Sequence, residues 1–101
     1  VVYSRGKGAL ERMIGEWIDF SEENNVPISL FEFGLIKTCY EDGKGGQNWL
    51  RDVLDICTDN GIHWSYWNFH GYWMGIFGNE SDELPERHSI NSSIAEVLME
   101  Y

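Results

Sequence analysis

The feature that most constrains the fold is an alternation of helix-like and strand-like segments along the chain. Two short apolar runs, over 28–33 and 62–69, have the composition of strands that are buried on both faces of a parallel sheet. Apolar residues recur every three or four positions over 8–24 and again over 47–59, which is typical of amphipathic helices. A third helical pattern covers 90–101. This order predicts an α/β fold with parallel strands and right-handed crossovers.

Residues that favour turns separate these segments. Pro27 marks the boundary between the first helix and the first strand, and Asn60-Gly61 supplies a left-handed residue that ends the second helix. A glycine-containing loop over 42–46 precedes the second helix, and a long loop over 71–87 follows the second strand. We expect Trp17 and Trp49 to lie in the core because both belong to helical stripes.

Two strands do not complete a parallel sheet, because each would leave an unpaired edge and the helices would keep uncovered apolar stripes. The 101 residues therefore predict one domain or less. The chain also starts with Val1-Val2-Tyr3, without an initiating Met or a leader segment. We expect it to be part of a longer protein.

The charge of the chain limits its partners. Seventeen acidic and seven basic residues give a formal net charge of −10, which would repel a nucleic-acid backbone or an anionic membrane surface. No apolar run approaches the length of a membrane-spanning helix. Cys39 and Cys57 have no metal-ligand spacing and are expected to be free, partly buried thiols, and no pair of histidines has zinc-ligand spacing. These observations favour a neutral or cationic ligand.

One acidic residue, Glu32, lies at a position where a catalytic residue is expected. Glu32, in the run Phe31-Glu32-Phe33-Gly34, ends an apolar strand, and the carboxyl ends of parallel strands form the active face of many α/β enzymes. Trp67 ends the next, aromatic-rich strand and could present a flat surface to a sugar ring. A salt bridge or helix-capping role for Glu32, and simple packing for Trp67, are the alternatives.

Other residues near the strand ends are weaker candidates. His70 and Trp73 could border a sugar site, although loop aromatics such as Tyr72 and Trp73 also pack loops down. By alternation His63 shares the face of Trp67 but lies deeper, so we expect it to be an interior histidine. Trp64 and Tyr66 are expected to face the helices. The loop acids are unsuited to acid/base chemistry because they lack burial; they are Glu41, Asp42, Glu80, Asp82, Glu83 and Glu86.

Three motifs, in order and at suitable separations, resemble the C-terminal part of glycoside hydrolase family five, the cellulase family. They are Asn25-Val26-Pro27-Ile28-Ser29-Leu30-Phe31-Glu32-Phe33-Gly34, Trp49-Leu50-Arg51-Asp52-Val53-Leu54-Asp55, and Gly61-Ile62-His63-Trp64-Ser65-Tyr66-Trp67-Asn68-Phe69. The resemblance implies that residues 1–101 are part of a catalytic domain. The fold would be the C-terminal portion of a (β/α)8 TIM barrel, comprising helix 6, strand 7, helix 7, strand 8 and helix 8.

The resemblance implies a retaining β-glycanase, with endo-β-1,4-glucanase favoured, acting on a polysaccharide or oligosaccharide without a metal or organic cofactor. Glu32 would be the nucleophile, and Trp67 would lie beneath the sugar at the cleavage site. The acid/base glutamate would lie on an upstream strand, so this piece alone should be inactive. Phe31 departs from the family, which usually has Gly before the nucleophile. The resemblance also favours a secreted protein.

Other functions remain open. A β-mannanase of the same family, or an enzyme acting on xylan, would have the same motifs. A noncatalytic carbohydrate-binding fragment or a barrel remnant would retain the aromatic residues without turnover. The sequons Asn79-Glu80-Ser81 and Asn91-Ser92-Ser93 would carry glycans only in a secreted eukaryotic protein.

Overall fold

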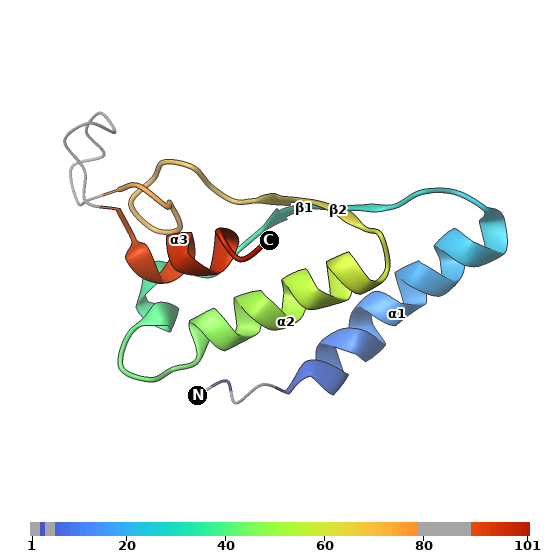
Figure 1. Cartoon of the computed structure of the whole chain (residues 1–101), viewed down its shortest axis with the longest axis horizontal. Helices are drawn as coiled ribbons and strands as arrows, with labels where there is room; N and C mark the ends of the chain where they lie inside the picture. Colours follow the sequence, from blue (N-terminus) through green and yellow to red (C-terminus); the bar gives the residue numbers. More distant parts are fainter. Residues whose placement is uncertain (1–2, 4–5, 79–89) are drawn as a thin grey trace.

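The computed structural model describes Tyr3, residues 6–78 and residues 90–101 (Figure 1). In chain order the elements are α1 (Lys7–Asn24), β1 (Ser29–Phe33), the short 3-10 helix η1 (Lys37–Tyr40), α2 (Gly46–Asp59), β2 (His63–Tyr66) and α3 (Ser92–Leu98). The predicted alternation of helices and strands is confirmed. None of the helices in the described part is long and apolar enough to cross a membrane.

The two strands pair in parallel, as predicted, and α2 forms the crossover between them. Ser29 pairs with His63, Leu30 with Trp64, and Phe33 with Tyr66. Between the last two pairs β1 contains one more residue than β2, so the strand has a β-bulge there. The strand β2 is shorter than the predicted run because the chain leaves the sheet after Tyr66.

The helix ends follow the turn chemistry of the sequence. Gly61, just past α2, has a φ of +63°, a conformation that glycine adopts without a steric penalty. Asn91 caps α3, because its side-chain oxygen accepts a hydrogen bond from the Ile94 N–H at 3.4 Å. The cap sets the start of α3 at Ser92, and the helix ends at Leu98. The observed helix is thus shorter at both ends than the predicted segment 90–101.

The sheet is covered on one face, where α2 runs beneath it (Figure 1). Along β1, Leu30 is half-buried and Phe33 is buried, whereas Ser29, Phe31 and Glu32 are exposed. The opposite face, which we call the open face, has no covering element among the described residues. The prediction of strands buried on both faces is therefore wrong for this structure.

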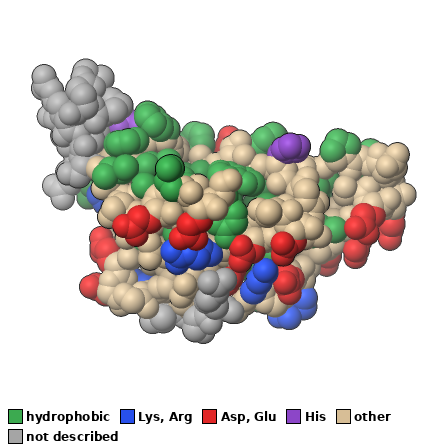
Figure 2. All heavy atoms as spheres, in the orientation of Figure 1, with side chains coloured by type: hydrophobic (Ala, Val, Ile, Leu, Met, Phe, Trp, Pro, Cys, Tyr) green, Lys and Arg blue, Asp and Glu red, His purple; other side chains and the backbone are tan. Residues whose placement is uncertain are grey.

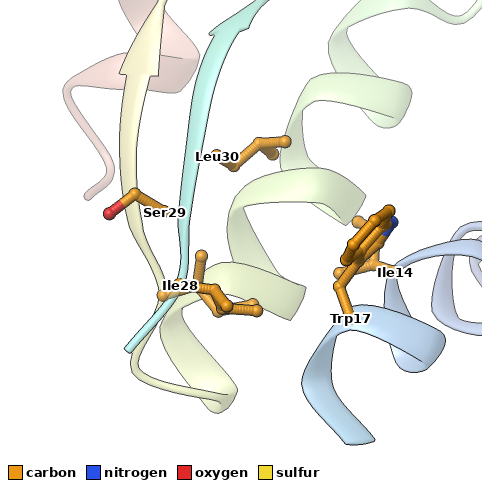
Figure 3. A pocket seen from close by; sticks show the side chains of 6 residues that line it. Ile14, Trp17, Ile28, Ser29 and Leu30 are labelled. Atoms are coloured by element: carbon orange, nitrogen blue, oxygen red, sulfur yellow. The ribbon is translucent and has the colours of Figure 1, made fainter. Parts of the chain in front are cut away.

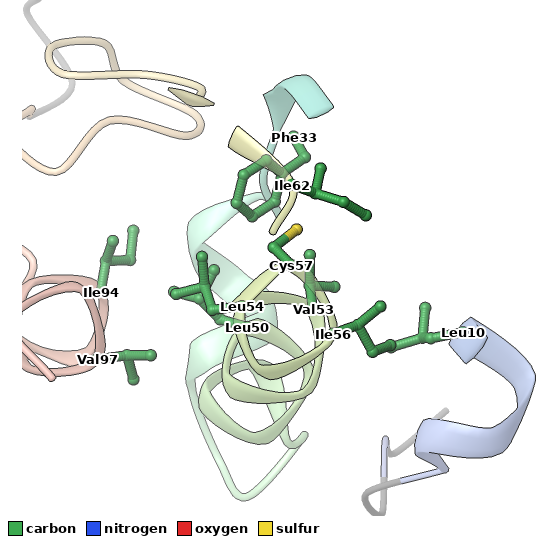
Figure 4. Close-up of a cluster of buried hydrophobic side chains, with 10 residues drawn as sticks. All are labelled: Leu10, Phe33, Leu50, Val53, Leu54, Ile56, Cys57, Ile62, Ile94 and Val97. Atoms are coloured by element: carbon green, nitrogen blue, oxygen red, sulfur yellow. The ribbon is translucent and has the colours of Figure 1, made fainter. Parts of the chain in front are cut away.

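The core is centred on α2 (Figure 4). This helix packs against α1, β2 and α3, and its buried side chains meet apolar residues from every other main element. Full burial of one large aliphatic side chain contributes about 1.5–3 kcal/mol, so α2 is the main source of stability. The buried apolar residues are Leu10, Phe33, Leu50, Val53, Leu54, Ile56, Cys57, Ile62, Ile94 and Val97.

The helix α1 is only partly covered by α2. Leu10 is buried and Ile14 is half-buried, but Trp17 is 63% exposed. The predicted core position of Trp17 is wrong because the apolar surface of α1 is broader than the contact that α2 makes with it. Trp49, by contrast, is half-buried and contacts Phe33 with ring centroids 6.4 Å apart.

Candidate functional site

Glu32 lies in the β-bulge at the end of β1. Leu30 and Phe33 both turn toward the α2 side, although three positions separate them, and the two residues between them are exposed. The bulge therefore directs both Phe31 and Glu32 to the open face. The φ of Glu32 is +56°, which costs an L-residue roughly 1–2 kcal/mol. Strained backbone of this kind clusters at functional sites.

Trp67 directly follows β2 and adjoins the end of β1. Its N–H donates a hydrogen bond to the Phe33 carbonyl at 2.9 Å. A Cβ on Gly34 would overlap the Trp67 carbonyl oxygen and would lie 3.3 Å from Tyr66 Cε2. Only glycine allows this close approach of the two strand ends. Glu32 on β1 and Trp67, the residue directly after β2, each lie next to a residue of the Phe33–Tyr66 pair.

Three of the predicted site residues share one pocket. An open pocket of about 510 Å³ follows β2 and contains Trp67, His70 and Trp73. The Trp67 side chain is 46% exposed and that of Trp73 is 61% exposed, so both indole rings are accessible to a ligand. Glu32 does not line this pocket but lies on the adjacent strand. The complete lining is Trp67, Asn68, His70, Gly71, Tyr72, Trp73 and Met74.

The loop that carries the pocket is folded back on itself. The Ile76 N–H donates to the Asn68 carbonyl at 3.0 Å, and the Phe77 N–H donates to the Phe69 carbonyl at 2.9 Å. A Cβ on Gly75 would overlap the backbone of Phe77, so a larger residue would open this turn. The first part of the predicted loop over 71–87 is therefore an ordered turn, and its last part lies outside the described residues.

The segment before α2 fixes this loop from the side. The Lys37 N–H donates to the Trp73 carbonyl at 2.8 Å, and the Lys37 ammonium lies 3.9 Å from the centroid of the Tyr72 ring. The latter distance is within the range of a cation–π interaction. The Tyr72 and Trp73 rings meet edge to face at 4.7 Å. These contacts orient Trp73 while leaving most of its surface free.

Two tyrosines support the pocket from the α2 side of the sheet. The Tyr66 hydroxyl donates to the Met74 carbonyl at 3.2 Å and lies 3.4 Å from the Tyr40 hydroxyl. Burial raises the pKa of Tyr66, and burial followed by the hydrogen bond to Tyr66 raises the pKa of Tyr40. Both hydroxyls therefore stay protonated at neutral pH and serve as neutral hydrogen-bonding groups.

Sequence reasoning missed three residues of the pocket, Asn68, Gly71 and Met74. The Oδ1 atom of Asn68 is buried and accepts no hydrogen bond within the described part of the chain. Asn68 could have been selected from the sequence, because it is a polar residue directly after Trp67. Met74 had no such signal, because its position depends on how the loop turns back.

The remaining sequence candidates do not extend the site. His63 is exposed on the open face, so the prediction of an interior histidine is wrong for this structure. Glu41 and Asp42 are exposed in the loop before α2, whereas Glu80, Asp82, Glu83, Glu86 and the sequon at Asn79 lie outside the described residues. Within the described ranges no carboxylate lines the pocket, and no cluster of His, Cys, Asp and Glu could hold a metal ion.

The two cysteines are free, with Cys39 half-buried and Cys57 buried, which confirms the prediction. Burial raises the pKa of the Cys57 thiol. Neither cysteine lines the pocket after β2.

Comparison with known proteins adds no identification, since no family model, no curated protein and no solved structure matches this chain. The functional argument therefore rests on the residues and on their geometry.

Proposed function

We propose that this chain is the nucleophile-bearing part of a retaining β-glycanase, most specifically an endo-β-1,4-glucanase of the cellulase family. One observation carries the proposal. Glu32 is held in a strained bulge on the open face, at the strand end that contacts Trp67 and its pocket. An exposed carboxylate beside accessible indole rings is suited to a polysaccharide substrate, whose pyranose rings have apolar C–H faces.

Glu32 would act as the nucleophile of a double displacement. Its carboxylate attacks the anomeric carbon, the glycosidic bond breaks, and a glycosyl-enzyme intermediate forms that water then hydrolyses. The leaving oxygen must be protonated by a second carboxyl group roughly 5–5.5 Å from the first. We propose that this acid/base belongs to another part of the protein, because no carboxylate among the described residues lines the pocket beside Trp67.

An apolar groove beside β1 supports the larger barrel that this mechanism needs (Figure 3). The groove has a volume of about 300 Å³ and lies between the exposed Trp17 of α1 and the side chains of Ile28 and Leu30. Among the described residues β1 pairs with β2 alone, so its other edge could pair with a further strand. A strand placed there would cover the groove and continue the sheet as a TIM barrel requires.

The decisive experiment labels the nucleophile in the full-length protein that carries this chain. A 2-deoxy-2-fluoro-β-cellobioside with a good leaving group should trap the glycosyl-enzyme, because fluorine slows both steps and the leaving group accelerates the first. Peptide mapping by mass spectrometry should place the adduct on Glu32. Glu32→Gln should abolish both labelling and cellulose hydrolysis, while Glu16→Gln, an exposed carboxylate of α1, should change neither.

Labelling of another residue, or hydrolysis by Glu32→Gln at the wild-type rate, would remove Glu32 as the nucleophile. Parallel assays on glucan, mannan and xylan would separate a glucanase from a β-mannanase. The trap should be repeated with the corresponding mannoside if mannan proves to be the substrate.

A noncatalytic carbohydrate-binding role is the second candidate. It is favoured by the pocket itself, which brings Trp67 and Trp73 together without needing a carboxylate. Under this alternative the full-length protein would bind cello-oligosaccharides, and Trp67→Ala would weaken binding. Neither hydrolysis nor labelling of Glu32 would be seen.

A further inference from the structure

The ring of Phe31 is an exposed aromatic group for which the proposed mechanism gives no role. It is 67% exposed, although it lies in the middle of a strand. Among the described residues no ring pair includes Phe31. An aromatic side chain buries a large apolar area when it is covered, so the exposed ring of Phe31 offers a contact surface to a ligand.

The register of the sheet places Phe31 on the same face as Glu32 and one residue farther from the pocket end of β1. The pairs Leu30–Trp64 and Phe33–Tyr66 bracket both Phe31 on β1 and Ser65 on β2. Phe31 and Ser65 are both exposed, and therefore share the open face with Glu32 and Trp67. Phe31 precedes Glu32 in a strand that runs toward the pocket end of the sheet, so its ring lies one residue deeper than the carboxylate.

The bulge is what makes this arrangement possible. In a regular strand, neighbouring side chains point to opposite faces, so a carboxylate on the open face would be preceded by a side chain directed toward α2. The extra residue lets Phe31 and Glu32 turn to the same face. The same backbone irregularity thus directs both side chains.

We propose that the Phe31 ring forms the floor of the sugar site beneath Glu32 and Trp67, where it contacts the C–H groups of the bound pyranose and sets how deeply the sugar enters. This inference rests on the proposed function. The floor is apolar and uncharged, and hydrophobic side chains also gather along the sheet side of the molecule, whereas acidic side chains lie over the helices (Figure 2). A neutral sugar fits such a surface better than a charged one does.

The contact would be made equally with the substrate and with the transition state, because Phe31 carries no group that takes part in bond making. Its loss should therefore raise KM and leave kcat nearly unchanged. We expect Phe31→Leu, which stays apolar but loses the flat ring, to raise KM for cello-oligosaccharides roughly three- to tenfold. Phe31→Tyr keeps the ring and should stay within about twofold of the wild type.

The test uses the full-length protein and measures both kinetics and binding. Binding of cellotetraose is measured by calorimetry in a Glu32→Gln background, so that no turnover interferes. Phe20→Leu on α1, also an exposed phenylalanine but outside the sheet, is the matched control and should not change KM or binding. Urea unfolding of each variant records any change in stability.

The outcomes separate the inference from the function on which it rests. A loss of affinity in Phe31→Leu that Phe31→Tyr restores supports a floor that touches the sugar. If KM and affinity were unchanged while stability fell, Phe31 would only pack against the remainder of the full-length protein, and the inference would fail. If Glu32→Gln instead left hydrolysis intact, or if the wild type bound no oligosaccharide, the proposed function itself would fail.

Discussion

The close approach of the two strands at Gly34 leads to a prediction with an internal control. In Gly34→Ala the new methyl group would overlap the backbone carbonyl of Trp67, which cannot move without shifting the end of β2. The methyl would also lie 3.3 Å from Met74 Cε, which is tighter than ordinary contact. The two strand ends must therefore separate.

The structure allows the size of the effect to be worked out. Forcing one extra carbon into a packed contact costs about 1–3 kcal/mol. Separation of the strand ends would also break the hydrogen bond of 2.9 Å between Trp67 and Phe33, which contributes about 0.5–1.5 kcal/mol. We therefore expect Gly34→Ala to lower the free energy of unfolding by about 1.5–4.5 kcal/mol.

Gly15→Ala is the matched control, because it makes the same chemical change in the interior of α1, where an added Cβ has no neighbour within 4 Å. Alanine is the better helix former, so this variant should be more stable by about 0.5–1 kcal/mol. Urea unfolding followed by tryptophan fluorescence and by circular dichroism measures both variants. A Gly34→Ala protein within about 0.5 kcal/mol of the wild type would refute the overlap argument.

Three further predictions concern single side chains. Trp67→Ala should weaken oligosaccharide binding about tenfold without a change in the bond that is cleaved, and unchanged calorimetric affinity would make Trp67 a packing residue. In the folded protein a thiol reagent should modify Cys39 faster than Cys57, because Cys57 is buried and its raised pKa lowers the thiolate fraction; equal rates before denaturation would contradict this. Glu100, hydrogen-bonded to Arg51 at 2.9 Å, has a lowered pKa, so its stabilising effect should be complete above the ordinary value of 4.5 and fade as the pH falls further. The stability difference between wild type and Glu100→Gln should shrink in acid, and a difference that grew there would overturn the sign.

The spacing of apolar residues predicts the bounds of the two long helices, α1 and α2, well. The helices α1 and α2 begin within a residue of the predicted segments, and both end at the predicted residues, Asn24 and Asp59. Periodicity indicates that a helix has an apolar side, but it does not say how much of that side a neighbour covers. For this reason the pattern predicts a core position for Trp17, which is largely exposed.

The sequence predicts which residues belong to the candidate site more readily than it predicts their arrangement. The sequence singles out Glu32 and Trp67 because each lies at the end of a predicted strand, and the pocket contains three of the four predicted site residues. The bulge that turns Phe31 and Glu32 to one face depends on the register between two strands, which no local pattern in β1 records. Met74 carries no signal in the sequence, because contacts between the two ends of the loop define how the loop folds back on itself.

The central position of α2 has a consequence for the motions of the molecule. Because α1, β2 and α3 all pack on this helix, local openings that detach one of them leave α2 in place, whereas loss of α2 removes the support of all three. Its amide protons should consequently exchange with solvent at rates close to those set by global unfolding. The outer turns of α1 and the pocket loop, which have fewer buried neighbours, should exchange through smaller and more frequent openings. Hydrogen exchange should therefore be slowest for the amides of α2 and much faster for those of the pocket loop.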